Sequence, residues 1–371
     1  MSINQFTRYK FCSESNQEFA QTLLKRVNNY FKQNNIERFG DRSMIVKSIF
    51  AFGIYFALFA AILFGDFSMP VLFLLWSLLG LGAAIIGTTV FHDALHGTFS
   101  KNKTVNKIME FSAAILGVSG EMWKIQHNNL HHNYTNIENM DTDIDTHNVL
   151  RFTPNQKRRW FHRFQLFYAP VLYGIMTLVW ISFKDFVSLE NYKKRGLIKT
   201  KQKYTKEMWK NIFVKVGYFG TMVVLPIFVL PHAFWITILM FITMHFVCGF
   251  FLSIVFQTAH VMPHTKFLET EIPEVEENWL VHQLMTTSNF AMKNKVLYWI
   301  IGGLNYQVEH HLFPNISHIH YPKLSKIVKQ TTAEFNIPYY SHKTFAGAIY
   351  RHFQHLYQLG KKQVAMVPVG A

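Results

Sequence analysis

Seven histidines stand in three short clusters, and histidine is the side chain that most often binds metals in proteins. The clusters are His92 with His96, then His127, His131 and His132, then His310 and His311. Neutral imidazole is a good ligand for iron, zinc and copper. Each cluster follows or flanks a long apolar segment. The arrangement therefore predicts a metal centre at a membrane surface.

The spacing within each cluster favours side chains that lie together. His92 and His96 are four residues apart, which places both imidazoles on one face of a helix. The second cluster repeats this spacing and adds an adjacent third ring. Gln307 stands three residues before His310, so its amide lies within about one helical turn of the last pair. One such pair is a weak signal, but three together are a strong one.

The number of imidazoles indicates more than one metal ion. His260, which follows the last apolar run, brings the set to eight, although an interfacial histidine bonded to a backbone carbonyl is the alternative there. Two metals with open positions account for eight nitrogens better than one closed zinc site does. Zinc stays possible, but no His-Glu-x-x-His motif supplies the base for hydrolysis. Cys12 and Cys248 alone cannot build a cysteine-ligated site.

Carboxylates near the clusters are candidates to orient the imidazoles. A metal-bound imidazole normally donates its other N–H to a carboxylate or carbonyl. We expect this role for Asp93, Glu309 and Asp141, with solvation or helix capping as the alternative. His245 lies inside an apolar run, where we expect a hydrogen-bonding or tunnel residue and not a ligand.

The composition is that of a polytopic membrane protein. Hydrophobic residues make up 50% of the 371 residues and charged residues only 16%. The formal net charge is +15, and the excess lies between apolar segments, where it marks the cytoplasmic side. No basic helix interleaved with stacking aromatics appears outside these loops, which argues against nucleic acid as a partner.

Four apolar runs are long enough to span about 30 Å of hydrocarbon. They form two hairpins, Ile45–Phe64 with Met69–Phe91 and Ile212–Leu230 with Ala233–Phe256. A further run, Phe164–Phe183, has basic stretches on both sides, so a crossing would place one of them on the wrong side. We assign it to a re-entrant or interfacial segment. An even number of crossings then separates any two histidine clusters, so all of them lie on one side of the membrane.

The predicted fold is thus an all-α polytopic membrane protein with two transmembrane hairpins, four spans and a cytoplasmic helical cap that holds a di-metal site. We expect an N-terminal cytoplasmic arm over residues 1–44 and a single domain over residues 45–371. The run from Ile108 to Val118 predicts a short interfacial helix between the first two clusters.

The clusters also carry a resemblance to a known family. HDALH at 92–96, HNNLHH at 127–132 and QVEHH at 307–311 resemble the three histidine boxes of integral-membrane fatty acid desaturases. The third box begins with Gln in place of His, between GLNY at 303–306 and LFP at 312–314, and is similar to the front-end and acyl-lipid branch. The second box has three residues between its first histidine and the pair, where stearoyl-CoA-type enzymes have two.

The resemblance implies an oxygen-dependent enzyme that introduces a cis double bond into a long-chain acyl-CoA or acyl-lipid. It implies two iron ions, with Gln307 at a metal-binding or water-holding position, and the ligands His92, His96, His127, His131, His132, His260, His310 and His311. No His-Pro-Gly-Gly motif of a fused cytochrome b5 is present, so we expect a separate ferredoxin or cytochrome b5 as electron donor. The expected location is the membrane, with the boxes on the cytoplasmic side, and the cell inner membrane in a bacterium.

Two alternatives stay open. A hydroxylase of the same superfamily would use the same irons and stop at oxygen insertion. A metal transporter would also use histidines, but transport sites lie near the bilayer midplane, whereas these clusters lie beyond the ends of spans.

Overall fold

The computed structural model describes residues 8–269 and 274–361, and these are mostly helical. The all-α prediction holds apart from two pairs of two-residue parallel strands. The described residues divide into two compact units. The first unit contains residues 41–125 and 171–253, and the second contains residues 8–40, 126–170, 254–269 and 274–361.

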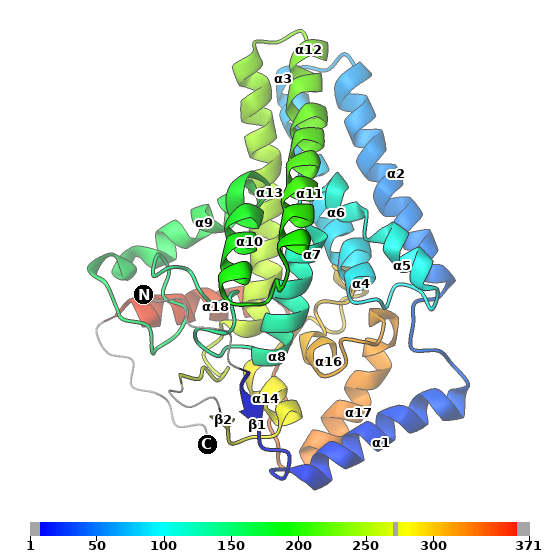
Figure 1. Ribbon diagram of the computed structural model, residues 1–371, viewed down its shortest axis with the longest axis vertical. Coiled ribbons are helices and arrows are strands. Elements are labelled where there is room, and N and C mark those ends of the chain that lie inside the picture. The colour runs from blue at the N-terminus through cyan, green and yellow to red at the C-terminus, as the bar shows by residue number, and fades with distance from the viewer. Residues whose placement is uncertain (1–7, 270–273, 362–371) are drawn as a thin grey trace. The chain divides into compact units, whose positions relative to one another are not determined.

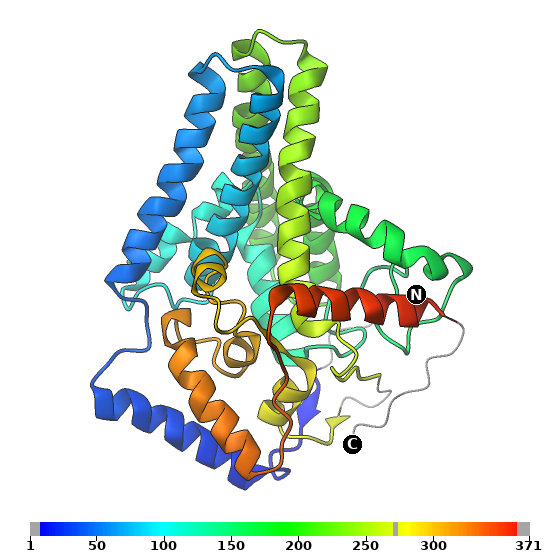
Figure 2. The same ribbon diagram turned by 180° about the vertical axis from the view of Figure 1, so that it is seen from behind.

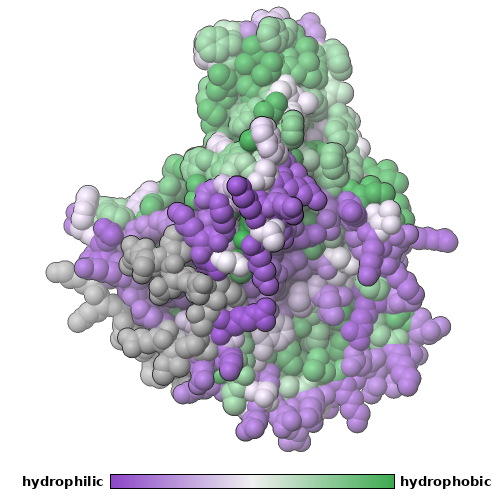
Figure 3. All heavy atoms as spheres, viewed as in Figure 1, coloured by the Kyte–Doolittle hydropathy of each residue, from purple (hydrophilic) through white to green (hydrophobic). Residues whose placement is uncertain are grey.

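Long apolar helices form the first unit and run side by side in both views (Figures 1 and 2). They are α2 (Arg42–Phe64), α3 (Met69–Ile86), α11 (Lys201–Phe219), α12 (Leu225–Val229) and α13 (Phe234–His260), whose last seven residues belong to the second unit. Their outer surface is largely hydrophobic (Figure 3), with Phe64 82% and Phe228 84% exposed. Such a surface is suited to lipid and not to water.

Five helices within the described residues are long and apolar enough to cross a membrane. Four of them, Arg42–Phe64, Met69–Leu95, Lys201–Val229 and Phe234–His260, contain the four predicted spans, apart from Leu230 and Ala233 at the turn of the second hairpin. The fifth, Trp160–Lys194, contains the run that the sequence analysis assigned to the interface. It comprises η3 (Trp160–Phe164), α9 (Gln165–Val179), η4 (Trp180–Lys184) and α10 (Asp185–Lys194). Length and composition alone therefore allow a fifth crossing.

Short π-helical turns keep two of the long helices continuous. η1 (Gly87–Phe91) joins α3 to α4 (His92–Leu95), so the second span runs directly into the first histidine cluster, as predicted. η5 (Gly220–Val224) joins α11 to α12 in the same way. Gly80 lets α3 approach α13 closely, because a Cβ there would lie 2.2 Å from the carbonyl oxygen of Met244.

A buried ion pair that the sequence did not reveal ties four segments of the first unit together. Lys215 Nζ lies 2.6 Å from Asp185 Oδ2, and it also donates to the carbonyl oxygens of Gly117 and Trp180. Asp185 in turn accepts from the backbone N–H of Ser119 at 2.9 Å and from the Trp180 indole at 3.1 Å. Both charges are thus paired and hydrogen-bonded, which their burial requires.

Breaking this pair is expected to destabilise the first unit strongly. Asp185→Asn leaves the buried ammonium of Lys215 without a counter-charge, a change that costs about 3–5 kcal/mol. Thermal unfolding in detergent should show the loss, and Asp185→Asn with Lys215→Met should recover much of it. Glu110→Gln is the matched control, because the Glu110–Lys124 pair is about one-third exposed and worth at most about 1 kcal/mol. Equal midpoints for Asp185→Asn and this control would contradict the assignment.

The region after the first cluster differs from the prediction. Two short helices, α5 (Lys103–Met109) and α6 (Ser112–Ile115), replace the single interfacial helix expected over 108–118. Gly117, with φ of +71°, follows α6, and a Cβ there would lie 2.5 Å from the ring of Tyr218. Ile108 and Phe111 are 60% and 70% exposed, so the segment still presents an apolar surface.

In the second unit, α1 (Gln17–Asn34) packs on α17 (Tyr321–Glu334) around a core that includes Leu23 and Val328. Strand β1 (Lys10–Phe11) pairs in parallel with β2 (Glu274–Val275), and β3 (Asn289–Phe290) with β4 (Ser341–His342). The remaining helices are η2 (Lys124–His131), whose first two residues belong to the first unit, α8 (His132–Tyr134), α14 (Trp279–Thr286), α15 (Lys295–Ile300), α16 (Gln307–Leu312), η6 (His318–His320) and α18 (Phe345–Gly360).

Candidate metal centre

Six of the eight predicted ligands gather in the second unit. They come from three separate parts of the chain, namely η2 with α8, the last residue of α13, and α16. All six are at most 4% exposed: His127, His131, His132, His260, His310 and His311. Buried imidazoles in such number need partners, because an unpaired polar group in the interior costs free energy.

The second box lies on a π-helical turn and not on a regular α-helix. In a π-helix the backbone hydrogen bonds join residues five apart, and His132 stands five residues after His127. Their Nε2 atoms are 3.1 Å apart. Two imidazoles bound to one metal at about 2.1 Å and at right angles would have nitrogens about 3 Å apart. The wider turn thus supplies a pair that the i, i+4 spacing did not predict.

His131, His260 and His311 form a second group, whose ligand atoms all lie within 4.8 Å of one another. Their outer nitrogens are each held by a partner. His131 Nδ1 lies 3.1 Å from both oxygens of Asp141, His260 Nδ1 lies 3.3 Å from the carbonyl of Thr286, and His311 Nδ1 lies 2.9 Å from Gln283 Oε1. With Nδ1 fixed in this way, Nε2 is the atom available to a metal.

His310 faces the pair of His127 and His132. Its ring centroid lies 4.5 Å from that of His132 and 5.8 Å from that of His127. Its Nδ1 lies 3.1 Å from the hydroxyl of Tyr321 on α17. The same pattern therefore recurs, with one ring nitrogen held from outside and the ring packed among other imidazoles. These donors fit a metal that accepts nitrogen ligands.

The electrostatics of the site centre on His131 and Asp141. Burial lowers the pKa of His131, but the nearby carboxylates of Asp141 and Asp143 outweigh it and raise the pKa to about 9. Burial likewise raises the pKa of Asp141, but the His131 charge and the hydrogen bonds to that carboxylate bring the net pKa below its usual value. The pair thus combines a negative charge with an imidazole that it holds in place.

Glu309 lies in the third box, but its hydrogen bonds lead away from the imidazoles. Its carboxylate accepts from Asn289 Nδ2 at 2.9 Å and from the Tyr339 hydroxyl at 2.8 Å. Burial raises its pKa to about 7. Successive helical residues point about 100° apart, so Glu309 and the next histidine face different neighbours on α16. The carboxylate thus orients the third box through the strand β3 and not by contact with a ring.

The first box lies in the first unit. The rings of His92 and His96 are 4.6 Å apart, as expected for their spacing, and Trp123 packs edge-on against both at 5.7 Å. Asp93 Oδ1 lies 3.3 Å from Nδ1 of His92. The box is therefore formed and packed within its own unit.

Gln307 begins α16 and is 1% exposed. Its amide nitrogen has no hydrogen-bond partner among the residues that the structure describes. A buried donor of this kind calls for a ligand or a water molecule. The position is thus suited to holding a group that the protein itself does not supply.

The polar groups that orient the third box and His260 could not be identified from the sequence. Gln283 and Thr286 on α14 and Tyr321 on α17 carried no spacing signal, because their partners are far away in the sequence. His245 is buried in α13, with Nε2 2.9 Å from the hydroxyl of Tyr218 and Nδ1 3.1 Å from that of Thr177. Both of its ring nitrogens are engaged in hydrogen bonds.

Comparisons with known proteins point to one family. Residues 68–343 match the family model for fatty acid desaturases. The chain is 34% identical over 357 residues to an acyl-lipid (8-3)-desaturase of Physcomitrium patens, covering 95% of this chain and 73% of the relative. It is 32% identical over 348 residues to an sn-1 linoleoyl-lipid 6-desaturase of Synechocystis, covering 92% of this chain and 96% of the relative.

These matches favour desaturation over hydroxylation or metal transport. They span the first and the third histidine boxes and the helices between them, and the relatives are desaturases by name. The buried histidine groups described above could hold a metal, on which enzymes of this kind depend. The chain belongs to the fatty acid desaturase family and is an oxidoreductase that desaturates fatty acyl chains.

Proposed function

We propose that the protein uses two iron ions and molecular oxygen to introduce a cis double bond into a lipid-linked acyl chain. The observation that carries the proposal is the group of His131, His260 and His311, whose outer nitrogens are each held by an acceptor while their ligand atoms converge. Imidazole-rich, buried and supported by carboxylate and carbonyl acceptors, this group has the properties of a metal site.

In this proposal one iron would be held by the group of His131, His260 and His311. The other would be held by His127, His132 and His310. His92 and His96 of the first box are the remaining two ligands of the proposed set. When bound, the irons would activate oxygen so that hydrogen can be removed from an unreactive methylene pair. Asp141, Gln283 and Tyr321 keep the rings in position, and Asp93 does so for His92. Gln307 would hold a water molecule at an open position.

The substrate that we propose is an acyl-lipid. Support comes from the relatives of Physcomitrium patens and Synechocystis, whose names specify acyl-lipid and linoleoyl-lipid desaturation. We propose a separate electron donor with an acidic surface, because the chain is basic and opposite charges favour encounter. Ferredoxin and free cytochrome b5 are the two classes that fit.

We further propose four crossings, with Trp160–Lys194 lying at the interface and all three boxes on the cytoplasmic side. Basic residues on both sides of that helix support this assignment, since they favour the same side of the membrane. The arm over 1–44 and the domain over 45–371 complete the proposed organisation, with residues 1–7, 270–273 and 362–371 outside the described residues.

Labelling of single cysteines tests the crossings. In a background with Cys12→Ser and Cys248→Ser, we expect Asp66→Cys and His232→Cys to react from one side and Lys199→Cys from the other. Reaction of Lys199→Cys from the same side as Asp66→Cys would indicate a fifth span.

Expression in a host that lacks the product tests the function. Gas chromatography with mass spectrometry should show a new cis double bond, and oxygen consumption should depend on iron in the purified protein. A hydroxylated acyl chain without a double bond would overturn the reaction proposed. Purified active protein without iron would overturn the cofactor and leave the family assignment intact.

Gln307→His tests the proposed water position. An imidazole there would bind iron directly and fill the open position, so we expect product formation to fall about 10- to 100-fold, the range known for changes around metal ligands. Iron content should stay unchanged. The control is Gln330→His on the exposed face of α17. Full activity of Gln307→His would mean that the position accepts either side chain.

A further inference from the structure

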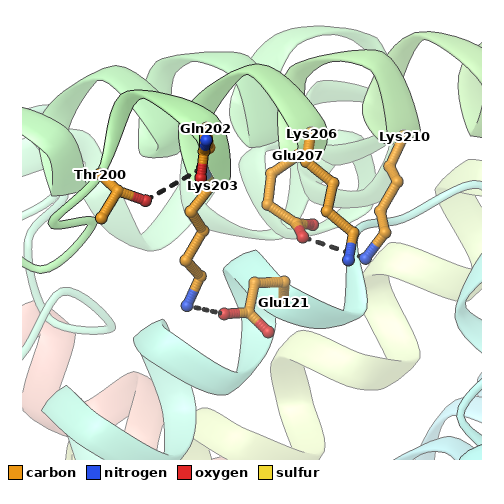
Figure 4. Close-up of a pocket in the computed structure, with 7 residues that line it drawn as sticks. All are labelled: Glu121, Thr200, Gln202, Lys203, Lys206, Glu207 and Lys210. Atoms are coloured by element: carbon orange, nitrogen blue, oxygen red, sulfur yellow. Dashed lines mark hydrogen bonds and ion pairs between the residues drawn. The ribbon is translucent and has the colours of Figure 1, made fainter.

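A basic cavity lies at the start of α11, outside the histidine site. It has a volume of about 460 Å³ and is lined by Glu121, Thr200, Gln202, Lys203, Lys206, Glu207 and Lys210. All of these residues belong to the first unit, and all but Glu121 come from α11 or its cap. Figure 4 shows the lysines on one side of α11, facing Glu121 on α7 (Gly120–Trp123).

The cavity is lined by one more lysine than glutamate side chains. Lys203 pairs with Glu121 at 2.6 Å, and Lys210 pairs with Glu207 at 3.0 Å. Lys206 has no acidic partner among the described residues, and it extends toward Lys210 (Figure 4). The ammonium groups of Lys206 and Lys210 repel each other, with only the Glu207 carboxylate of Lys210 to offset their charge, and an added anion would relieve the repulsion. The cavity is therefore suited to a negatively charged group.

The surrounding sequence increases the positive potential. Residues 193–210 contain eight Lys or Arg side chains and a single acidic side chain, Glu207. Basic residues near a membrane surface attract anionic lipids by about 1 kcal/mol each. The potential thus favours a ligand in the membrane that carries net negative charge.

The exposed face of α11 beside this cavity has the order of side chains expected of a helix that enters a membrane. Trp209, one turn after Lys206, is 55% exposed, and tryptophan is enriched at membrane–water interfaces. Phe213 and Val216 follow on the same face and are 70% and 66% exposed. From Lys206 to Phe213 the helix rises about 10 Å. A single face of α11 therefore changes from basic to aromatic to aliphatic, in the order in which a phospholipid presents phosphate, interface and acyl chains.

We propose that this cavity binds the phosphate headgroup of an anionic phospholipid. The phosphate would contact the ammonium groups of Lys206 and Lys210, and the acyl chains would lie along Phe213 and Val216. Glu121 lies on α7, two residues before Trp123, which packs against His92 and His96. Only the short helix α7 would therefore separate the bound lipid from the first box. The proposal does not rest on the iron assignment.

Lipid retention by the purified full-length protein tests this proposal. Native mass spectrometry should detect bound phosphatidylglycerol, supplied in mixed micelles, in preference to phosphatidylcholine at the same concentration. Lys206→Gln should lower retention at least fivefold, and Lys206→Gln with Lys210→Gln should lower it further. Lys206→Arg should keep it. Lys326→Gln on α17, another exposed lysine, is the matched control and should bind as the unaltered protein does.

Three outcomes would overturn the proposal. These are unchanged retention in Lys206→Gln, equal retention of phosphatidylglycerol and phosphatidylcholine, and displacement of the lipid by inorganic phosphate at equal concentration. The last result would identify a site for free phosphate and not for a membrane lipid. Lys206→Gln leaves both ion pairs of the cavity intact, so a loss of binding in this variant cannot be ascribed to an uncompensated Glu207. Iron content, measured on the same samples, reports separately on the metal centre.

Discussion

His311→Ala is expected to abolish double-bond formation, with a loss of activity of more than about 100-fold. Substitution of residues that only hydrogen-bond to metal ligands already lowers metal affinity or activity about 10- to 100-fold. His311 is fully buried, its ligand atom converges with those of His131 and His260, and its Nδ1 is held by Gln283. Removing the ring takes away one nitrogen donor and leaves the other two with too few partners to retain the metal. Iron analysis of the purified protein should show a loss of about half of the bound iron.

A matched control separates ligand loss from a general effect of removing a histidine. His147 is exposed, with 84% of its side chain accessible, and it lies beside Asp145 outside the metal centre. His147→Ala should therefore keep both its iron and its activity. Membrane insertion should be equal in the two variants, since the hydrophobic spans are untouched. Retained product formation in His311→Ala would remove His311 from the proposed ligand set.

Asp141→Asn is expected to lower iron affinity about 10- to 100-fold. The carboxylate accepts from His131 Nδ1 and from the backbone N–H groups of Asn136 and Asp143, each at 2.9–3.1 Å. An amide has a single oxygen, so at least one of these donors loses its acceptor, and the ring of His131 loses the charge that holds it. Iron retention against a graded series of chelator concentrations measures the change.

The comparison variant for this prediction is Asp143→Asn. Asp143 lies 3.5 Å from the same nitrogen of His131, but its side chain is 29% exposed and a water molecule can replace part of its contact. Its effect on iron retention should be several-fold smaller. If Asp141→Asn lowered the thermal midpoint but left iron retention unchanged, Asp141 would support the loop and not the metal. Equal losses in both variants would show that charge matters and the direct hydrogen bond does not.

Some elements of the fold could be predicted because their cause is local. The runs from Ile45 and Met69 are apolar over about twenty residues, and a helix of that length satisfies its own backbone groups in lipid. The helix from Met69 continues to Leu95, so the i, i+4 spacing of His92 and His96 places their rings together. Prediction failed over 108–118, where the apolar pattern does not show that Gly117 must adopt a left-handed conformation against Tyr218.

The sequence by itself determined the long helices, through uninterrupted hydrophobicity, and the candidate metal ligands, because metal ligation demands particular side chains at short, recognisable spacings. Only the tertiary structure decided what holds those ligands in place. The sequence did not show that a π-helical turn would pair His127 with His132. The contact of Gln283 with His311 and the buried pair of Lys215 and Asp185 join groups whose separation in the chain follows no rule. Such contacts depend on which helices pack together, and a periodic pattern within one helix contains no record of its neighbours.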